Sequence, residues 1–285
     1  MASISSLFGY ILNLIYNLIH NYGLAIILFS VLLKVILLPL SIKQQKTMKK
    51  TAKMQGKIKE LQEKYKNDQM KLNQEMMDLY KKENMSPFSG CLTSILQIIL
   101  LFAMFGLVRN PLTYMKKIDN ATIENYKTEM RQELGENSIS NNYPEISVLK
   151  YVNDYKSHED PLYINTEFFG LDLSKIPQEN LKDWTVYIIP VLYVITTFIS
   201  MQITTKMTTT QKDKNKEINS DKKEENPEEM AMQMNKSMAW FMPLMSVSIS
   251  IIAPLGLALY WLVNNILMIA ERLVLNKCIK SEEEE

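Results

Sequence analysis

Five long apolar runs constrain the fold of this chain more than any other feature. They cover residues 23–42, 91–108, 184–203, 238–253 and 255–274. An α-helix of about 20 apolar residues crosses the hydrocarbon core of a bilayer. Because lipid offers the backbone no hydrogen-bond partners, each run is expected to be helical. The sequence therefore predicts an all-α polytopic membrane protein with five transmembrane helices.

The average composition hides these runs. The 285 residues are 47% hydrophobic, and their mean hydropathy of -0.10 would also suit a soluble chain. Lysine-rich and acidic segments between the runs dilute the average, so position along the chain is more informative. Between the last two runs, only Pro254-Leu255-Gly256 offers a turn, which predicts a tight helical hairpin.

The distribution of lysine predicts the orientation. Segment 43–86 is rich in lysine, so the positive-inside rule places it in the cytoplasm. Alternation then puts 109–183 outside, and 204–237 and the 275–285 tail inside. The acidic excess of 109–183 agrees with this assignment. Because the number of spans is odd, we expect the N-terminus outside and the C-terminus in the cytoplasm.

Residues 1–22 are predicted to form an amphipathic helix that lies in the outer membrane interface. Apolar residues recur at helical spacing from Ile4 to Ile19, and asparagines lie on another face. The alternative is that these residues form a sixth, short hydrophobic anchor.

Segment 43–86 is predicted to be a cytoplasmic helical hairpin. Apolar residues recur in it at spacings of three and four, lysine, glutamate and glutamine fill the other positions, and Asn67-Asp68 offers a turn. In 109–183 we expect a helix from about Thr122 to Leu134, and asparagine-rich stretches such as 137–142 favour exposed loop. Segment 204–237 contains a stretch without an apolar face, which is expected to be partly disordered.

A cation, Lys34, lies inside the first apolar run. On an isolated helix a cation at that depth costs roughly 3 kcal/mol, so polar surroundings are expected. Ser30 lies one helical turn away on the same face. Glu271 is the one carboxylate within the five runs, and it is too near the inner end of its helix to be an obvious counter-ion for Lys34. The sequence therefore favours a wet groove that opens towards the cytoplasm. The alternative is that Lys34 snorkels towards Lys43, about 13 Å away along the helix, although a lysine side chain covers only part of that distance.

The sequence lacks the motifs of common membrane enzymes. It contains no GxxxxGK[ST], HExxH or GxSxG pattern. Two histidines and two distant cysteines suggest neither a metal site nor a disulfide framework. We therefore expect no enzyme activity, no catalytic residues, no cofactor and no metal.

Four segments carry a resemblance to a known family: Asn21–Lys50, Lys59–Gln97, Phe168–Ser174 and Met242–Asn265. Through them the chain resembles the YidC family of membrane protein insertases, in its short, five-span bacterial form. The resemblance implies a cytoplasm-facing hydrophilic groove with a basic residue at Lys34. Most relatives have arginine there, and lysine keeps the charge without the bidentate fork. By motif, the residues that line the groove or the substrate path are Ser30, Lys34, Gln97, Gln202, Tyr260 and Trp261.

The resemblance also implies a function. It indicates an insertase and chaperone of the bacterial plasma membrane that inserts and helps to fold membrane proteins without nucleotide hydrolysis. The implied partners are nascent membrane proteins, the lipid bilayer, the ribosome and the secretion channel, with no specific nucleic acid sequence. Two other classes stay open: a small transporter or channel with a lysine-containing cavity, and a structural assembly factor. The internal repeats typical of many transporters are not found.

Overall fold

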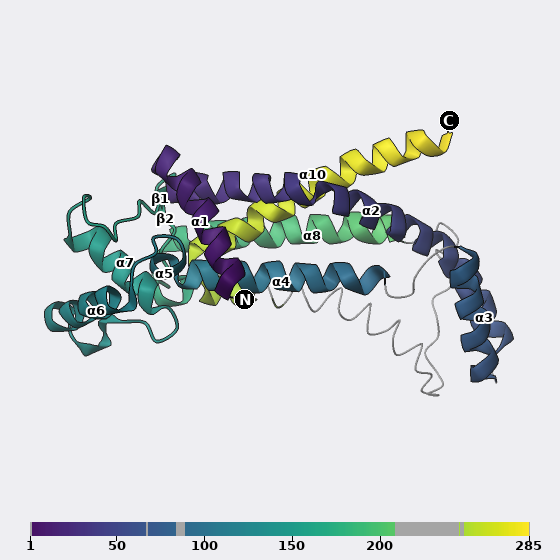
Figure 1. The fold of residues 1–285 in the computed structure, drawn as a ribbon, viewed down its shortest axis with the longest axis horizontal. Coiled ribbons are helices and arrows are strands. Elements are labelled where there is room, and N and C mark those ends of the chain that lie inside the picture. Colours follow the sequence, from purple (N-terminus) through teal and green to yellow (C-terminus); the bar gives the residue numbers. More distant parts are fainter. Residues whose placement is uncertain (1, 67, 84–88, 209–244, 246–247, 285) are drawn as a thin grey trace. The chain divides into compact units, whose positions relative to one another are not determined.

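The structure is a computed structural model in which helices predominate (Figure 1). It describes residues 2–66, 68–83, 89–208, 245 and 248–284. Within these ranges the strands are β1 (Glu167–Phe168) and β2 (Leu171–Asp172), which pair antiparallel as a short hairpin. The predicted helical class is therefore confirmed.

Four long helices contain most of the apolar runs. They are α2 (Tyr22–Lys64), α4 (Ser89–Arg109), α8 (Ile188–Thr208) and α10 (Leu255–Glu284). Segments of α2, of α8 with the turn before it, and of α10 are long and apolar enough to cross a membrane. In α4 the described apolar segment is Ile98–Arg109. The predicted run 238–253 lies largely outside the described residues.

Helix α1 (Ala2–Ile19) precedes these four and is also long and apolar enough to cross a membrane. Length and composition therefore do not distinguish an interfacial helix from a sixth anchor. The contacts of α1, given below, bear on that choice.

The chain groups into two compact units. The first comprises residues 1–35, 99–197 and 234–267, and the second comprises residues 36–98, 198–233 and 268–285. Each of the four long helices contributes to both units. The first unit contains segment 109–183, the starts of α2, α8 and α10, and the end of α4.

In the second unit, α2 continues past the predicted end of the first run. It passes through Pro39 without a break and ends at Lys64. Helix α3 (Gln69–Lys82) follows, and the side chain of Asp68 caps it by accepting a hydrogen bond from the Lys71 amide (3.0 Å). An ion pair of 2.8 Å between Lys57 and Glu83 links α2 to the end of α3. Helix α10 also runs beyond its predicted end and includes most of the 275–285 tail.

Segment 109–183, in the first unit, has more regular structure than predicted. Helix α6 (Asn120–Leu134) contains the predicted 122–134 helix. Helices α5 (Pro111–Tyr114) and α7 (Pro144–Tyr155) occupy residues for which no helix was predicted. Helix α7 forms because it has a proline in its first turn, which favours a helix start, and an apolar face that becomes buried.

A buried carboxylate joins α7 to α5. Glu145 accepts hydrogen bonds from the amide (3.0 Å) and the hydroxyl (2.6 Å) of Thr113. Burial raises the pKa of Glu145, and the bonds from Thr113 act in the opposite direction. One buried apolar cluster extends from α2, α4 and α10 into α7. Segment 109–183 is therefore packed onto the helix ends.

Candidate functional site

Residues 165–175 bind the first residues of two long helices. The Tyr22 amide, at the start of α2, donates to the carbonyl of Asn165 (3.0 Å). At the start of α10, the Leu255 amide donates to Lys175 (2.9 Å) and the Gly256 amide donates to Leu173 (2.9 Å). The first amides of a helix have no partner within the helix. These carbonyls supply partners and hold α2 and α10 at a common level.

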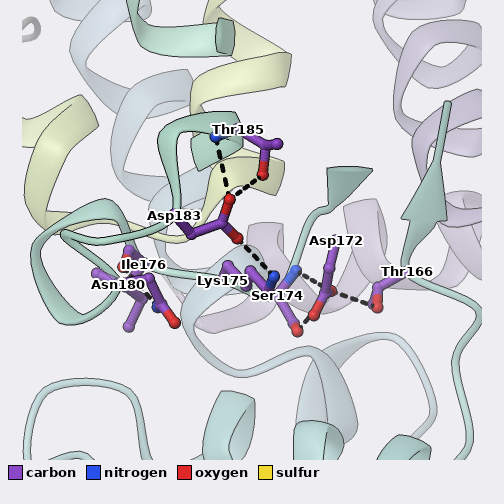
Figure 2. Close-up of polar contacts among 8 residues, drawn as sticks. All are labelled: Thr166, Asp172, Ser174, Lys175, Ile176, Asn180, Asp183 and Thr185. Carbon is purple, nitrogen blue, oxygen red and sulfur yellow. Dashed lines mark hydrogen bonds and ion pairs between the residues drawn. The ribbon is translucent and has the colours of Figure 1, made fainter. Parts of the chain in front are cut away.

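The start of α8 joins the same network, as Figure 2 shows. Asp183 accepts hydrogen bonds from the amide and hydroxyl of Thr185, in the η3 turn (Trp184–Tyr187) that leads into α8. Lys175 forms an ion pair of 2.7 Å with Asp183. Hydrogen bonds from Lys175 and Thr185 lower the pKa of Asp183 to about 2, and the bond to Asp183 raises the pKa of Lys175.

Because α2, α8 and α10 start from one network, residue number measures depth along them. Ser30 and Lys34 lie about 12 and 18 Å beyond Tyr22, at about 1.5 Å per residue. The hydrocarbon core is about 30 Å thick. In a bilayer whose hydrocarbon core begins at the level of Tyr22, Lys34 would lie beyond the middle, counted from the end where α2 begins.

Helix α10 packs closely against α2. A Cβ atom on Gly256 would lie 3.2 Å from the ring of Tyr22 and 3.6 Å from Ile26. Tyr260 follows Gly256 by one turn, and Ser30 follows Ile26 by one turn. The two residues are therefore at similar depths.

Two contacts one turn apart join α10 to α8. The rings of Trp261 and Tyr193 have centroids 5.8 Å apart. Asn265 donates a hydrogen bond of 2.7 Å to the hydroxyl of Thr197. The neighbouring Asn264 donates to the carbonyl of Tyr260 in its own helix (2.8 Å).

The structure places four of the six predicted groove residues in the first unit. Ser30 is 0% exposed and donates to the Ile26 carbonyl (2.8 Å). Tyr260 and Trp261 are buried, and Lys34 is partly exposed.

The other two predicted groove residues belong to the second unit. Gln202 is exposed on α8, and the side chain of Gln97 lies outside the described residues. The structure therefore brings Ser30, Lys34, Tyr260 and Trp261 into one unit and does not place the two glutamines relative to them. The groove assignment stays a prediction.

The pair of Thr197 and Asn265 was not among the predicted site residues. Both are polar residues about 14 to 15 Å from the starts of their helices, which is a matched depth. Polar groups in lipid need partners, so two polar residues at the same depth in different spans are candidates for a hydrogen bond. The sequence contained this signal for Thr197 and Asn265.

The described residues contain no group of three or more histidine, cysteine, aspartate or glutamate side chains that could hold a metal ion. Along the apolar segments of α2, α8 and α10, the side chains described above include the cation Lys34, hydroxyls, amides and aromatic rings. Such groups can bind and orient a polar or anionic segment within the membrane.

Comparison with known proteins identifies the family. Residues 14–283 match the family described as 60Kd inner membrane protein. A membrane protein insertase YidC of Treponema denticola is 28% identical over 98% of this chain and 38% of its own length. One of Chlorobaculum tepidum is 30% identical over 96% of this chain and 36% of its own length.

A third relative, from Caldanaerobacter subterraneus, is also called membrane protein insertase YidC. It is 41% identical over 38% of this chain and 53% of its own length. The chain therefore spans about half of the length of these relatives or less. The family match includes all four segments that carry the resemblance, so the prediction from the sequence is confirmed. The chain is a multi-pass membrane protein of the 60Kd inner membrane protein family, the family of the YidC membrane protein insertases.

Proposed function

We propose that the chain inserts membrane proteins into the bilayer and helps them to fold, without nucleotide hydrolysis. One observation carries the proposal: Lys34 is a partly exposed cation inside a segment of α2 that is long and apolar enough to cross a membrane, in a chain of the insertase family. Ser30 and the pair of Thr197 and Asn265 add polar groups within about 6 Å of its depth, and Tyr260 lies about 10 Å nearer to the start of its helix. A cation and polar groups at this depth suit a groove that opens towards the cytoplasm.

The proposed mechanism rests on differences in solvation. Moving a polar or acidic segment into lipid is costly because its groups lose water. A groove that holds water and the ammonium group of Lys34 lowers this cost for part of the path. The apolar helix of the substrate can then move into lipid, where burial of its apolar surface drives insertion. The membrane potential adds a force on acidic segments that move outward.

We propose that 109–183 and the N-terminus face outward and that 43–86, 204–237 and the C-terminus face the cytoplasm of a bacterial plasma membrane. The lysines of 43–86 support this orientation through the positive-inside rule. Nascent membrane proteins are the proposed substrates. The ribosome and the secretion channel are proposed partners.

The contacts of α1 support an interfacial position for this helix. Ser5 donates to the Ala103 carbonyl of α4 (2.9 Å), and Gly9 lies against the carbonyl of Tyr114. About 10 Å further along α1, the Tyr16 hydroxyl accepts a hydrogen bond from the Asn165 amide (2.8 Å). These partners belong to the 109–183 segment and the adjoining end of α4. A helix that crossed the membrane would leave that end, so we propose that α1 lies along the outer surface.

Reconstitution tests the proposed function. The purified chain is placed in liposomes and supplied with a single-span substrate that has an acidic external segment. Insertion without other proteins supports an insertase, and solute flux without insertion would support a transporter or channel. If neither occurs, an assembly role is favoured.

Substitution of Lys34 tests the role of its charge. We expect Lys34→Arg to keep insertion and Lys34→Ala to weaken it for acidic substrates. A partly exposed charge pair is worth about 1 kcal/mol, or about fivefold. Lys43→Ala, on the exposed part of α2, is the matched control and should change insertion less. If Lys34→Ala inserts all substrates as well as the unsubstituted chain does, the proposed role of the charge is refuted. The proposal that the chain is an insertase would still stand.

A further inference from the structure

The tip of the hairpin formed by β1 and β2 exposes a phenylalanine. Phe168 pairs with Leu171, so the turn consists of Phe169 and Gly170. Both have positive φ angles, 49° and 77°, as a type I′ turn requires. Phe169 is 89% exposed.

Phenylalanine is an unusual choice for this position. The first residue of a type I′ turn is commonly asparagine, aspartate or glycine, because these tolerate a positive φ. A bulky residue with positive φ is strained. Strain of this kind persists where the side chain has a role. In water, most of the surface of this ring would make no compensating contact, because 89% of the residue is exposed.

The hairpin lies beside the first turn of α2 (Figure 1). The side-chain amide of Asn21 donates to the Glu167 carbonyl (2.8 Å). The ring of Phe168 covers Gly23 so closely that a Cβ atom there would lie 2.3 Å from the ring. Phe169 in turn meets Phe168 edge to face, with centroids 4.7 Å apart. The tip is therefore at the level where α2 enters its apolar segment.

An apolar surface continues from this level along α2. Leu24 and Leu28 are exposed on α2 within the segment that is apolar enough to span a membrane. Leu18, near the end of α1, is also exposed, and Asn165 binds the adjacent His20 carbonyl (3.2 Å). Exposed apolar residues thus occur near the end of α1 and at the start of α2, the two helices joined to residues 165–168 by hydrogen bonds.

We propose that Phe169 inserts into the lipid interface at the end of the bundle where α2 begins. Aromatic side chains favour this zone, where the head groups meet the hydrocarbon. Contact with lipid supplies the apolar surroundings that the exposed ring lacks in the protein. Because residues 165–175 also bind the starts of α2 and α10, the inserted ring fixes this segment at the membrane surface. The proposal requires that α2 spans the bilayer and does not depend on insertase activity.

Tryptophan fluorescence tests the proposal in the full chain. Phe169→Trp and, as a control, Leu134→Trp are placed in nanodiscs of phosphatidylcholine and phosphatidylglycerol. Leu134 is also exposed (43%), but it lies at the end of α6 among exposed polar residues. Subtracting the spectrum of the native chain, which has three tryptophans, leaves the signal of the added indole. Quenching is measured with lipids brominated near the head group and with aqueous iodide.

We expect brominated lipid to remove most of the added fluorescence of Phe169→Trp, and iodide to affect it little. Leu134→Trp should show the reverse pattern. If iodide quenches Phe169→Trp as strongly as the control, the ring faces water and the proposal is wrong. If neither quencher acts, a protein surface such as a second copy covers the ring, and the proposal is also wrong.

Discussion

The close approach of α1 to α5 makes a prediction about Gly9. A Cβ atom at Gly9 would lie 2.0 Å from the Tyr114 carbonyl oxygen and 2.4 Å from its carbon. Gly9→Ala therefore forces the two backbones apart by about 1 Å, and a gap of that size forfeits about a quarter to a half of each dispersion contact. The hydrogen bond from Ser5 to Ala103 should weaken with it.

The change in the free energy of unfolding that Gly9→Ala causes is estimated from three contributions. Overpacking of this kind costs about 1–3 kcal/mol, and a lost hydrogen bond costs about 1 kcal/mol. Alanine in a helix recovers about 1 kcal/mol relative to glycine. The net effect of Gly9→Ala is a destabilisation of about 1–3 kcal/mol.

Gly56→Ala is the matched control. Gly56 lies in the interior of α2, and a Cβ atom there would meet nothing within 4 Å. The same chemical change should therefore stabilise that helix by about 1 kcal/mol. Thermal unfolding and hydrogen exchange of the α1 amides in detergent measure both variants. If Gly9→Ala is as stable as Gly56→Ala and leaves α1 protected, the reasoning about this contact is refuted.

Two further predictions concern polar pairs. In a double-mutant cycle of Thr197→Val and Asn265→Ala, unfolding in detergent should give a coupling energy of about 0.6–1.7 kcal/mol, and additive effects would contradict the hydrogen bond. The pKa of Asp183 is lowered to about 2 in the folded state, compared with about 3.9 in the unfolded chain. The ionised carboxylate therefore stabilises the folded state above about pH 3.9, and this contribution is lost as the pH falls from about 3.9 to about 2. Circular dichroism against pH should therefore show a smaller loss of stability in this window for Asp183→Asn, and identical curves would argue against the ion pair with Lys175.

The membrane class and the positions of most spans were predictable from local properties. The length of an apolar run and the distribution of lysine do not depend on how the chain packs. The same holds for Lys34, whose depth follows from its place in the run. The hairpin tip is different, because Phe168–Ser174 contributed to the family resemblance but nothing in the sequence singled out Phe169.

Helix α7 was not predicted, although its sequence contains a local signal for a helix. Pro144 in its first turn and the spacing of Ile146 and Leu149 favour a helix. The position of α1 had a weaker signal. Ser5 and Gly9 are four residues apart, a small-xxx-small pattern that allows helices to approach closely, but the pattern does not say which helix is approached.

The sequence by itself determined that this chain is a helical membrane protein with a cation beyond the middle of its first span. The tertiary structure decided which distant residues meet. Ser5 binds Ala103 across 98 positions, and Asn265 binds Thr197 across 68. It also decided that residues 165–175 bind the starts of α2 and α10. The physical reason is that hydrophobicity and helix propensity act within a few turns, whereas these pairings depend on packing between segments far apart in the chain.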